Sequence, residues 1–501
     1  MKRKLLFPLL LIGAISYAQV QEGNYLNGSA DEEFFGGDVA LSEDGSRMLV
    51  GVRSFDGVIN LSPVSQTGKI VMYEKSSDTW EQRGKYFIGE HVNEGFGVRV
   101  DVSEDGNVMA GGAPWNFPYT AIPRAGAVRV YQYVDGAWIY KGDDIDGENA
   151  ADRTGTAVAL AKNGDRIAVG TPQFDVGSDS NNGLIRVYDW DGEDWVQLGG
   201  DLVGDEGDFY GMYVDFSKDG NRMVTGSRFG ENEFGNKTGD IKVYDWSGTA
   251  WVQVGSDLAA TYEFTYFGQY CKISADGTRI VAAGYGHNSD RGIVKVYDWD
   301  GTDWSESFSK EGVDADEWYG YSVDLSDDGN ILVVGNPYST QAGSSSGRVF
   351  IYAYDGEEWS QIGDTINGDT EWAITGAAVS ISGDGQYVAV GSPYHGTDES
   401  KPGRVVVYNI SQLVLSTDEV VADDTVLAVY PTLTHGIVNF SSTKFTVSKI
   451  QVYNVSGQLV RDLNVGAQQN SINISTLTSG VYFLKMFNDQ GASIVKEVVR
   501  Q

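Results

Sequence analysis

The sequence predicts an all-β chain, a seven-bladed β-propeller followed by a small Ig-like β-sandwich, from its repeat, its turns and its composition. A unit of about 56 residues recurs seven times between Phe35 and Tyr408, as in repeat arrays. The 64 glycines against 10 prolines, with 12% aromatic residues, favour short strands and tight turns over helices. In each unit a turn glycine follows an opening glycine nine positions later. The opening glycines are Gly36, Gly97, Gly155, Gly211, Gly268, Gly320 and Gly376, and the turn glycines are Gly45, Gly106, Gly164, Gly220, Gly277, Gly329 and Gly385.

The third unit shows how each repeat is expected to form four antiparallel strands. Its strand-like runs are 155–160, 166–170, 183–188 and 195–199. Asn163-Gly164 separates the first two runs, and such dipeptides are strong hairpin signals because they tolerate the positive φ of tight turns. Four strands per unit, repeated seven times, describe a β-propeller. Four-stranded solenoid rungs are the alternative, which the seven-fold count and a closing strand disfavour.

The N-terminal strand is predicted to close the ring. The seventh unit stops after its third strand at Tyr408 and lacks the Trp-x-Gln-x-Gly segment of other units. A similar segment, 20–23, stands at the mature N-terminus, and Gly23 precedes Gly36 by the interval that separates Gly255 from Gly268. We therefore expect a propeller over 19–410 whose N-terminal strand completes the last blade and removes a free sheet edge.

The units resemble the FG-GAP repeats of integrin-α-like propellers. The resemblance rests on segments such as Phe96-Gly97 through Pro114, followed by Gly126-Ala127-Val128-Arg129-Val130-Tyr131. Such propellers often carry a calcium loop, but turns such as Ser103-Glu104-Asp105-Gly106 lack its regularly spaced oxygen ligands. Their serine and aspartate are expected to cap the turn backbone instead. Calcium could use the acidic loop with Asp175, Asp179 and Asn181, so the metal site stays unknown.

The N-terminus reads as an export signal. A basic start, Met1 to Lys4, precedes a short apolar run and the small-residue end Ser16-Tyr17-Ala18, which predicts a signal peptide over 1–18. The apolar run is too short for a transmembrane anchor.

The C-terminal part is expected to form a linker over 411–428 and a β-domain over 429–501. Four short alternating runs separated by glycine and serine turns predict a small sandwich. The domain resembles the C-terminal sorting domain of type IX secretion in Bacteroidetes. The matching segments are 429–431 with Gly436, 452–457, 477–482 and the basic end around Lys496 and Arg500, with Pro431-Thr432-Leu433 where the family usually has Pro-Asn-Pro. The resemblance implies contact with the type IX machinery and a secreted or cell-surface location.

The composition limits the classes of partner that the protein can bind. The formal net charge of −34 argues against nucleic acid and anionic lipid, which require a basic surface. The single cysteine, Cys271, excludes an intramolecular disulfide framework. We expect an extracellular protein or glycan as the ligand.

The candidate binding residues are aromatic side chains on one face of the propeller. The long, variable second-to-third and fourth-to-first connections all lie at one end of the blades, here called the loop face, where binding residues concentrate. The candidates there are Trp115, Phe117, Tyr119, Phe229, His287, Tyr338 and Tyr394. Acidic-aromatic pairs such as Asp208-Phe209 and Glu317-Trp318 precede the first strands. Aromatic faces beside carboxylates suit sugar rings, and the alternative is that these rings pack between blades.

The sequence predicts no enzyme and no catalytic residues. The 4 histidines are scattered without ligand-like spacing. Arg129 and Arg186 occupy equivalent third-strand positions and are expected on a solvated strand face rather than around a catalytic centre. The leading hypothesis is a secreted or cell-surface binding or adhesion propeller. A carbohydrate-binding protein or a glycoside hydrolase is the alternative, because the carboxylates are abundant.

Overall fold

The computed structural model describes residues 19–59, 62–116, 124–397, 400–413, 427–430, 433–434, 436–442, 447–454, 459–466, 469–487 and 493–500. It divides into two compact units, Met1–Val414 and Leu415–Gln501. The predicted signal peptide and most of the predicted linker lie outside the described residues.

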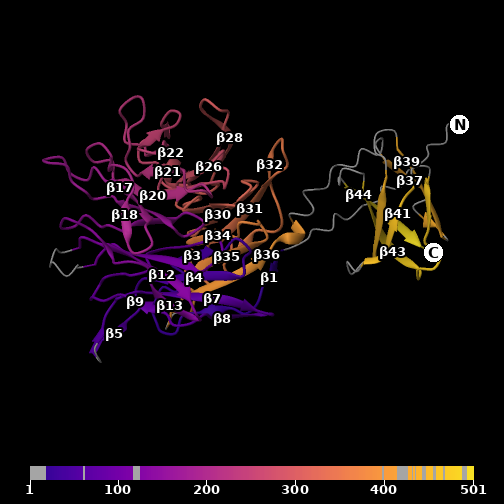
Figure 1. Ribbon diagram of the computed structural model, residues 1–501, viewed down its shortest axis with the longest axis horizontal. Helices are drawn as coiled ribbons and strands as arrows, with labels where there is room; N and C mark the ends of the chain where they lie inside the picture. The colour runs from indigo at the N-terminus through magenta and orange to yellow at the C-terminus, as the bar shows by residue number, and fades with distance from the viewer. Residues whose placement is uncertain are drawn as a thin grey trace. The chain divides into compact units, whose positions relative to one another are not determined.

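The described part of the first unit contains seven sheets of four or five antiparallel strands (Figure 1). Sheet one joins β3 (Asp38–Leu41), β4 (Arg47–Val52), β7 (Lys69–Ser76), β8 (Thr79–Gln82) and β9 (Phe87–Ile88). Sheet two joins β10 (Arg99–Val102), β11 (Val108–Ala113), β12 (Ala127–Val134), β13 (Ala137–Tyr140) and β14 (Ile145–Asp146). Sheet three joins β15 (Ala157–Leu160), β16 (Arg166–Thr171), β17 (Leu184–Trp190), β18 (Trp195–Gln197) and β19 (Leu202–Val203). Sheet four joins β20 (Tyr210–Phe216), β21 (Arg222–Ser227), β22 (Asp240–Trp246), β23 (Trp251–Gln253) and β24 (Leu258–Ala259).

The remaining sheets of this unit follow the same order. Sheet five joins β25 (Tyr270–Ile273), β26 (Arg279–Gly284), β27 (Ile293–Trp299) and β28 (Trp304–Glu311). Sheet six joins β29 (Ser322–Leu325), β30 (Ile331–Asn336), β31 (Arg348–Tyr354), β32 (Trp359–Gln361) and β33 (Ile366–Asn367). Sheet seven joins β34 (Ala378–Ile381), β35 (Tyr387–Ser392), β36 (Arg404–Asn409), β1 (Val20–Gln21) and β2 (Leu26–Asn27). A small hairpin of β5 (Gly57–Ile59) and β6 (Ser62–Val64) and a single turn, α1 (His287–Asp290), lie in the connections.

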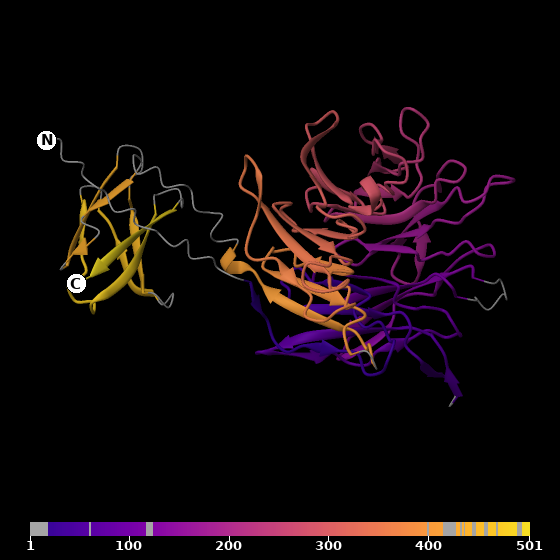
Figure 2. The ribbon, with the colours of Figure 1, turned by 180° about the vertical axis from the view of Figure 1, so that it is seen from behind.

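The first strands of these sheets contact one another in a closed cycle. The cycle runs β3, β10, β15, β20, β25, β29, β34 and back to β3. A ring of radially arranged antiparallel sheets around a central axis is the architecture of a β-propeller, and both views show the sheets fanning outward (Figure 2). The predicted all-β class is confirmed.

The N-terminal segment supplies the outer strands of sheet seven. β1 pairs antiparallel with β36, Val20 opposite Asn409, and β2 pairs with the other end of the same strand. Leu26 is buried in the core between sheets seven and one. The Trp80 indole of sheet one donates a hydrogen bond of 3.1 Å to the Glu22 carbonyl. The first described residues are thus bonded to both the last and the first sheet.

Polar side chains of the first strands join neighbouring sheets around the axis. In each case a side-chain oxygen accepts a hydrogen bond from a backbone N–H of the next sheet's first strand. These pairs are Asp38 with Val100, Asp101 with Leu160, Asp215 with Ile273, Asp324 with Ile381 and Ser380 with Leu41, at 2.6–3.1 Å. The bonds satisfy backbone donors that would otherwise be buried without a partner.

Tryptophans in the fourth strands make a second set of bonds near the outer edge. The indoles of Trp138, Trp195, Trp251 and Trp304 each donate to the carbonyl of the residue directly after the fourth strand of the preceding sheet, at 2.7–3.3 Å. A buried indole N–H needs such an acceptor, so these tryptophans have a structural role.

Glycines recur in the repeat because the backbones of adjacent sheets nearly touch. A Cβ built on Gly226 of β21 would overlap the carbonyl oxygen of Gly268, the opening glycine of the next unit. Equivalent overlaps occur at Gly51, Gly112, Gly170, Gly335 and Gly391. The fifth unit has Ala283 at this position, and its Cβ is accommodated beside Gly320.

We expect Gly226→Ala to destabilise the propeller by about 1–3 kcal/mol, because the methyl group forces two sheets apart. Denaturant unfolding measures the loss. The matched control is Ala283→Gly, which should cost only about 0.5–1 kcal/mol through backbone entropy. Equal losses in the two variants would contradict the close-approach explanation.

The second unit, described by itself, contains two sheets around one core. β37 (Leu427–Tyr430), β39 (Ile437–Ser442) and β42 (Ser471–Asn473) form the first sheet. β38 (Leu433–Thr434), β44 (Ser493–Arg500), β43 (Gly480–Phe487), β40 (Lys449–Asn454) and β41 (Leu459–Asn464) form the second. Buried Phe440 and Ile472 of one sheet pack in the same cluster as Val452 and Leu484 of the other. The Ig-like topology of this unit stays a prediction.

Candidate functional site

Charged side chains of the first strands surround a small axial cavity of about 70 Å³. Its ionisable lining consists of Asp38, Arg99, Asp101, Lys162, Asp215, Lys272, Asp324 and Asp327, with Tyr213 beside them. Each sheet contributes through the strand nearest the axis, so residues far apart in sequence converge. The cavity is polar, and its carboxylates outnumber its cations.

Burial shifts the pKa values of the carboxylates that line this cavity. Desolvation raises the pKa of Asp215 to about 6, and it also raises the pKa of Asp38 and Asp101. Burial alone would lower the pKa of Lys272, but the surrounding carboxylates, Asp215 foremost, raise it above its ordinary value. The Lys272 ammonium lies 3.4 Å from Asp215 and 3.8 Å from Asp324. Lys272 is therefore the cation that lies close to two carboxylates of this acid-rich cavity.

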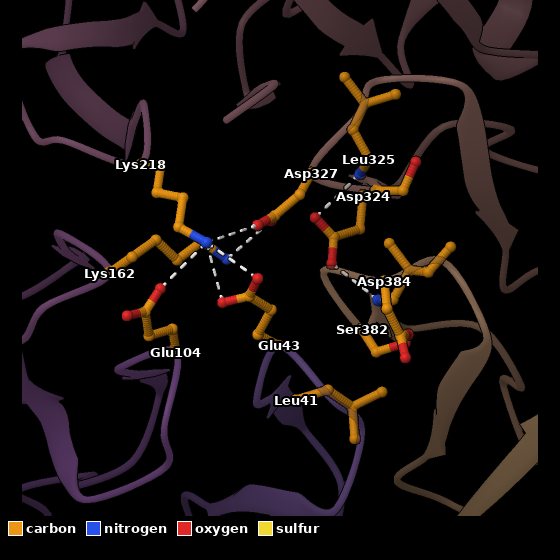
Figure 3. Close-up of polar contacts among 12 residues, drawn as sticks. Leu41, Glu43, Glu104, Lys162, Lys218, Asp324, Leu325, Asp327, Ser382 and Asp384 are labelled. Carbon is orange, nitrogen blue, oxygen red and sulfur yellow. Dashed lines mark hydrogen bonds and ion pairs between the residues drawn. The ribbon is translucent and has the colours of Figure 1, made fainter. Parts of the chain in front are cut away.

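Ion pairs cross the axis at the end formed by the short turns (Figure 3). Lys218 of sheet four lies 2.8 Å from Glu43 of sheet one and 3.1 Å from Glu104 of sheet two. Lys162 lies 3.3 Å from Asp327 of sheet six, which is also 3.8 Å from Lys218. The hydrogen bond from Lys218 lowers the pKa of Glu43. These ion pairs link the charged side chains at this end to residues of other sheets and so stabilise the ring.

Aromatic rings form an arc around the loop-face end of the axis. Neighbouring centroids lie 4.5–5.4 Å apart from Phe209 through Phe229, Tyr266, Tyr285 and Trp318 to Tyr338. The residue two before each opening glycine has positive φ in all seven units, and in three of them it is an arc residue. The recurring left-handed turn thus directs these rings onto one another.

A second recurring position exposes aromatic rings. The residue four before each opening glycine also has positive φ in all seven units. Five units use Glu32, Asn93, Ala151, Gly207 and Asp316 there, and the other two use Phe264 and Trp372. Phe264 is 56% exposed and Trp372 is 53% exposed. Bulky residues rarely adopt this conformation, and here they gain little burial in return.

Phe264, Tyr262 and Phe234 are exposed aromatic residues on two loops joined by a hydrogen bond, and together they are here called the exposed aromatic patch. Tyr262 is 61% exposed and Phe234 is 75% exposed. The two loops that carry the patch are joined, because the Phe264 N–H donates to the Lys237 carbonyl at 3.0 Å. The sequence analysis did not select these residues. For Phe264 the signal that could have found it is an aromatic residue at a position where five other units carry Glu, Asn, Ala, Gly or Asp.

Trp115 lines a loop-face pocket of about 180 Å³ between sheets one and two. The other lining residues are Arg53, Ser54, Gln66, Asn93 and Gly95. The Trp115 ring lies against Gly95, where a Cβ would overlap the indole. This pocket combines one aromatic ring with several hydrogen-bonding side chains.

The structure separates the predicted aromatic candidates by environment. Phe229, Tyr338 and Tyr394 are half-buried, and Tyr394 packs edge-on against Phe34 at 4.5 Å. His287 is 7% exposed and packs against Tyr262, so its imidazole offers little surface to a ligand. Trp115 is partly exposed in its pocket. Phe117 and Tyr119 lie outside the described residues.

Two further expectations concern charged residues. Arg129 does not lie on a solvated face, because it is 1% exposed and its guanidinium lies 2.8 Å from Asp144, whereas Arg186 is partly exposed and lies 2.8 Å from Asp201. The expectation was wrong for Arg129, because Glu94 and Asp144 enclose its side chain. The acids Asp208 and Glu317 of two acidic-aromatic pairs are buried, and Glu317 accepts hydrogen bonds from Asn336 and Ser339 at 3.0 and 2.9 Å.

The short turns use their polar side chains as caps. Ser103 donates to Asp105 at 2.7 Å and accepts from the Val108 N–H at 2.9 Å. In the acidic loop, Asp175 accepts a hydrogen bond from the Asn181 N–H at 2.7 Å. Among the described residues, no group of three or more His, Cys, Asp or Glu side chains is placed to hold a metal ion.

Comparison with known families finds one match in each part of the chain. Residues 428–501 match the secretion system C-terminal sorting domain, and residues 309–352 match the FG-GAP repeat. The second match begins within β28 and ends within β31, so it spans the junction of sheets five and six. A comparison with the curated proteins finds no match. Both resemblances inferred from the sequence are confirmed.

The sorting domain indicates the cellular location of the protein. A type IX sorting domain indicates a secreted or cell-surface protein and implies interaction with the type IX secretion machinery. In the part of the chain that the structure describes, no helix is long and apolar enough to cross a membrane.

Proposed function

We propose that this chain is a non-catalytic binding or adhesion protein of the cell exterior, which holds an extracellular protein or glycan on its loop face. The observation that carries the proposal is the pair of exposed aromatic residues, Phe264 and Trp372, at left-handed backbone positions. Strained conformations that are retained without a packing benefit concentrate at functional sites. Exposed aromatic rings supply large contact area at low entropic cost when a partner binds.

The axial charges support a structural rather than a catalytic role for the axial cavity. The Asp215 and Asp324 carboxylates each accept a backbone hydrogen bond from the next sheet and lie close to Lys272. Groups committed in this way orient strands and hold the ring closed. The loop face, by contrast, presents rings to solvent.

The proposal is tested with Phe264→Gly and Trp372→Gly in the full chain. Glycine adopts positive φ without steric cost, so these variants remove the rings and relieve the backbone. We expect an unchanged or higher melting temperature together with at least tenfold weaker binding. Binding is measured on arrays of immobilised polysaccharides and extracellular proteins.

The control is Glu32→Gly, which makes the same backbone change at the equivalent position of the first unit without removing a ring. It should leave array binding unchanged. A melting temperature lowered by several degrees in the Phe264 and Trp372 variants would show that the rings serve packing, and unaltered binding would overturn the proposal.

A further inference from the structure

We propose that the Trp115 pocket binds one uncharged sugar residue of a neutral glycan, stacked on the indole and hydrogen-bonded by Gln66 and Asn93. This inference rests on the proposed binding function and assigns a ligand class to one part of the loop face. The pocket lies in the first-to-second sheet region, whereas the exposed aromatic patch lies on a loop of sheet four and on the connection from sheet four to sheet five.

The pocket exists because the second unit departs from the repeat. Two residues before the opening glycine, the other units carry Phe34, Arg153, Phe209, Tyr266, Trp318 and Ile374. The second unit carries Gly95, and the Trp115 indole takes the space that a side chain would fill. The absence of a side chain at Gly95 allows the flat Trp115 ring to form part of the pocket wall. A ring of this kind offers its face to the C–H groups of a pyranose.

Gln66 and Asn93 can offer their side chains to a ligand, because backbone hydrogen bonds hold both residues in place. The Gln66 N–H donates to Asp56 at 2.8 Å, and the Asn93 N–H donates to the Ser65 carbonyl at 3.0 Å. Among the described residues, the side-chain amides of Gln66 and Asn93 have no hydrogen-bond partner, and both residues are exposed. Each amide carries two donors and an acceptor, which suits adjacent hydroxyl groups.

Charge and size restrict the ligand. Arg53 is the cation of the lining, and its guanidinium is placed 4.9 Å from the Phe34 ring centre. Asp56 accepts a hydrogen bond from the N–H of the lining residue Gln66, which places a carboxylate beside the pocket. The formal charge of −34 further disfavours polyanionic chains. The cavity of about 180 Å³ is smaller than the ~300–1,000 Å³ of sites for drug-sized ligands, which favours a single sugar ring.

The test measures binding of the full chain to neutral gluco-, manno-, galacto- and xylo-oligosaccharides, with an oligogalacturonide as the acidic arm. Titration calorimetry gives affinities, and saturation-transfer NMR identifies the sugar ring in contact. We expect Trp115→Ala and Asn93→Gly each to weaken binding of a neutral oligosaccharide at least tenfold. Asn93 has a φ of 57°, so glycine preserves its backbone and guards against misfolding.

Asp316→Gly, which makes the same backbone change as Asn93→Gly at the equivalent position of the sixth unit, is the matched control and should leave oligosaccharide affinity unchanged. If no neutral oligosaccharide binds, if only the acidic one binds, or if Trp115→Ala binds as tightly as the wild type, the pocket assignment is overturned. Array binding that persists and depends on Phe264 or Trp372 would then leave the proposed function standing. Loss of both kinds of binding would remove both proposals.

Discussion

Removal of residues 19–27 lowers the melting temperature of the propeller by several degrees. The deletion strips β1 and β2 from β36 and exposes that strand as an edge. It removes the buried Leu26 side chain, for which a loss of about 2–3 kcal/mol is typical. It also breaks the bonds from Trp80 to Glu22 and Asn24, each contributing about 1 kcal/mol. The summed loss is on the order of 5 kcal/mol, and calorimetry on the full chain measures it.

The control for this deletion is removal of residues 415–501, which form a separate compact unit. We expect the propeller transition to keep its temperature in that variant. An N-terminal deletion that melts like the wild type would show that β36 needs no partner to close the ring. A free edge should also promote association, so sedimentation of the deletion variant provides a second readout.

Lys272→Met destabilises the chain by about 3 kcal/mol at pH 7.5. Methionine fills a similar volume but leaves Asp215 and Asp324 without their nearby cation, and an unpaired buried charge is costly. Denaturant unfolding measures the loss. The control is Lys85→Met at an exposed lysine, for which the change should lie within about 0.5 kcal/mol.

The pH dependence distinguishes lost charge from lost packing. Burial raises the pKa of folded Asp215 to about 6, above the ~3.9 of an unfolded aspartate. Between these values the folded state binds more protons, so this group's contribution to stability falls as pH rises from about 4 to 6. Without Lys272 the folded pKa rises further, so the variant's deficit should be larger at pH 7.5 than at pH 5. A deficit that is equal at both pH values would identify packing as the cause.

Local chemistry explains which parts of the fold the sequence could predict. The turn dipeptides and opening glycines act within a few residues, so the repeat indicated four strands per unit, and the structure has sheets of four or five strands. The register of the repeat placed a closing strand at 20–23, and β1 pairs with β36. The sorting domain was readable because its short motifs recur in order.

The candidate site was less predictable because exposure depends on other sheets. Phe229 and Phe264 are both aromatic residues of loop-face connections, but Phe229 packs against two rings and Phe264 projects into solvent. The rings that cover Phe229 come from positions 20 and 37 residues away in sequence, Phe209 and Tyr266. Arg129 was misassigned for the same reason, since Glu94 and Asp144 enclose it only after sheets one and two pack.

The sequence by itself determined the all-β class, the repeat and the export route, because periodicity, turn chemistry and terminal motifs are local properties of the chain. Only the tertiary structure decided the sign of φ at Phe264 and Trp372. It also decided that Asp215, Asp324 and Lys272 converge on the axis. The packing of Trp115 against Gly95 was likewise visible only in the tertiary structure. Each of these depends on contacts between residues of different repeats or different connections. Such contacts arise only when the ring closes and the desolvation and packing of one sheet are set by its neighbours.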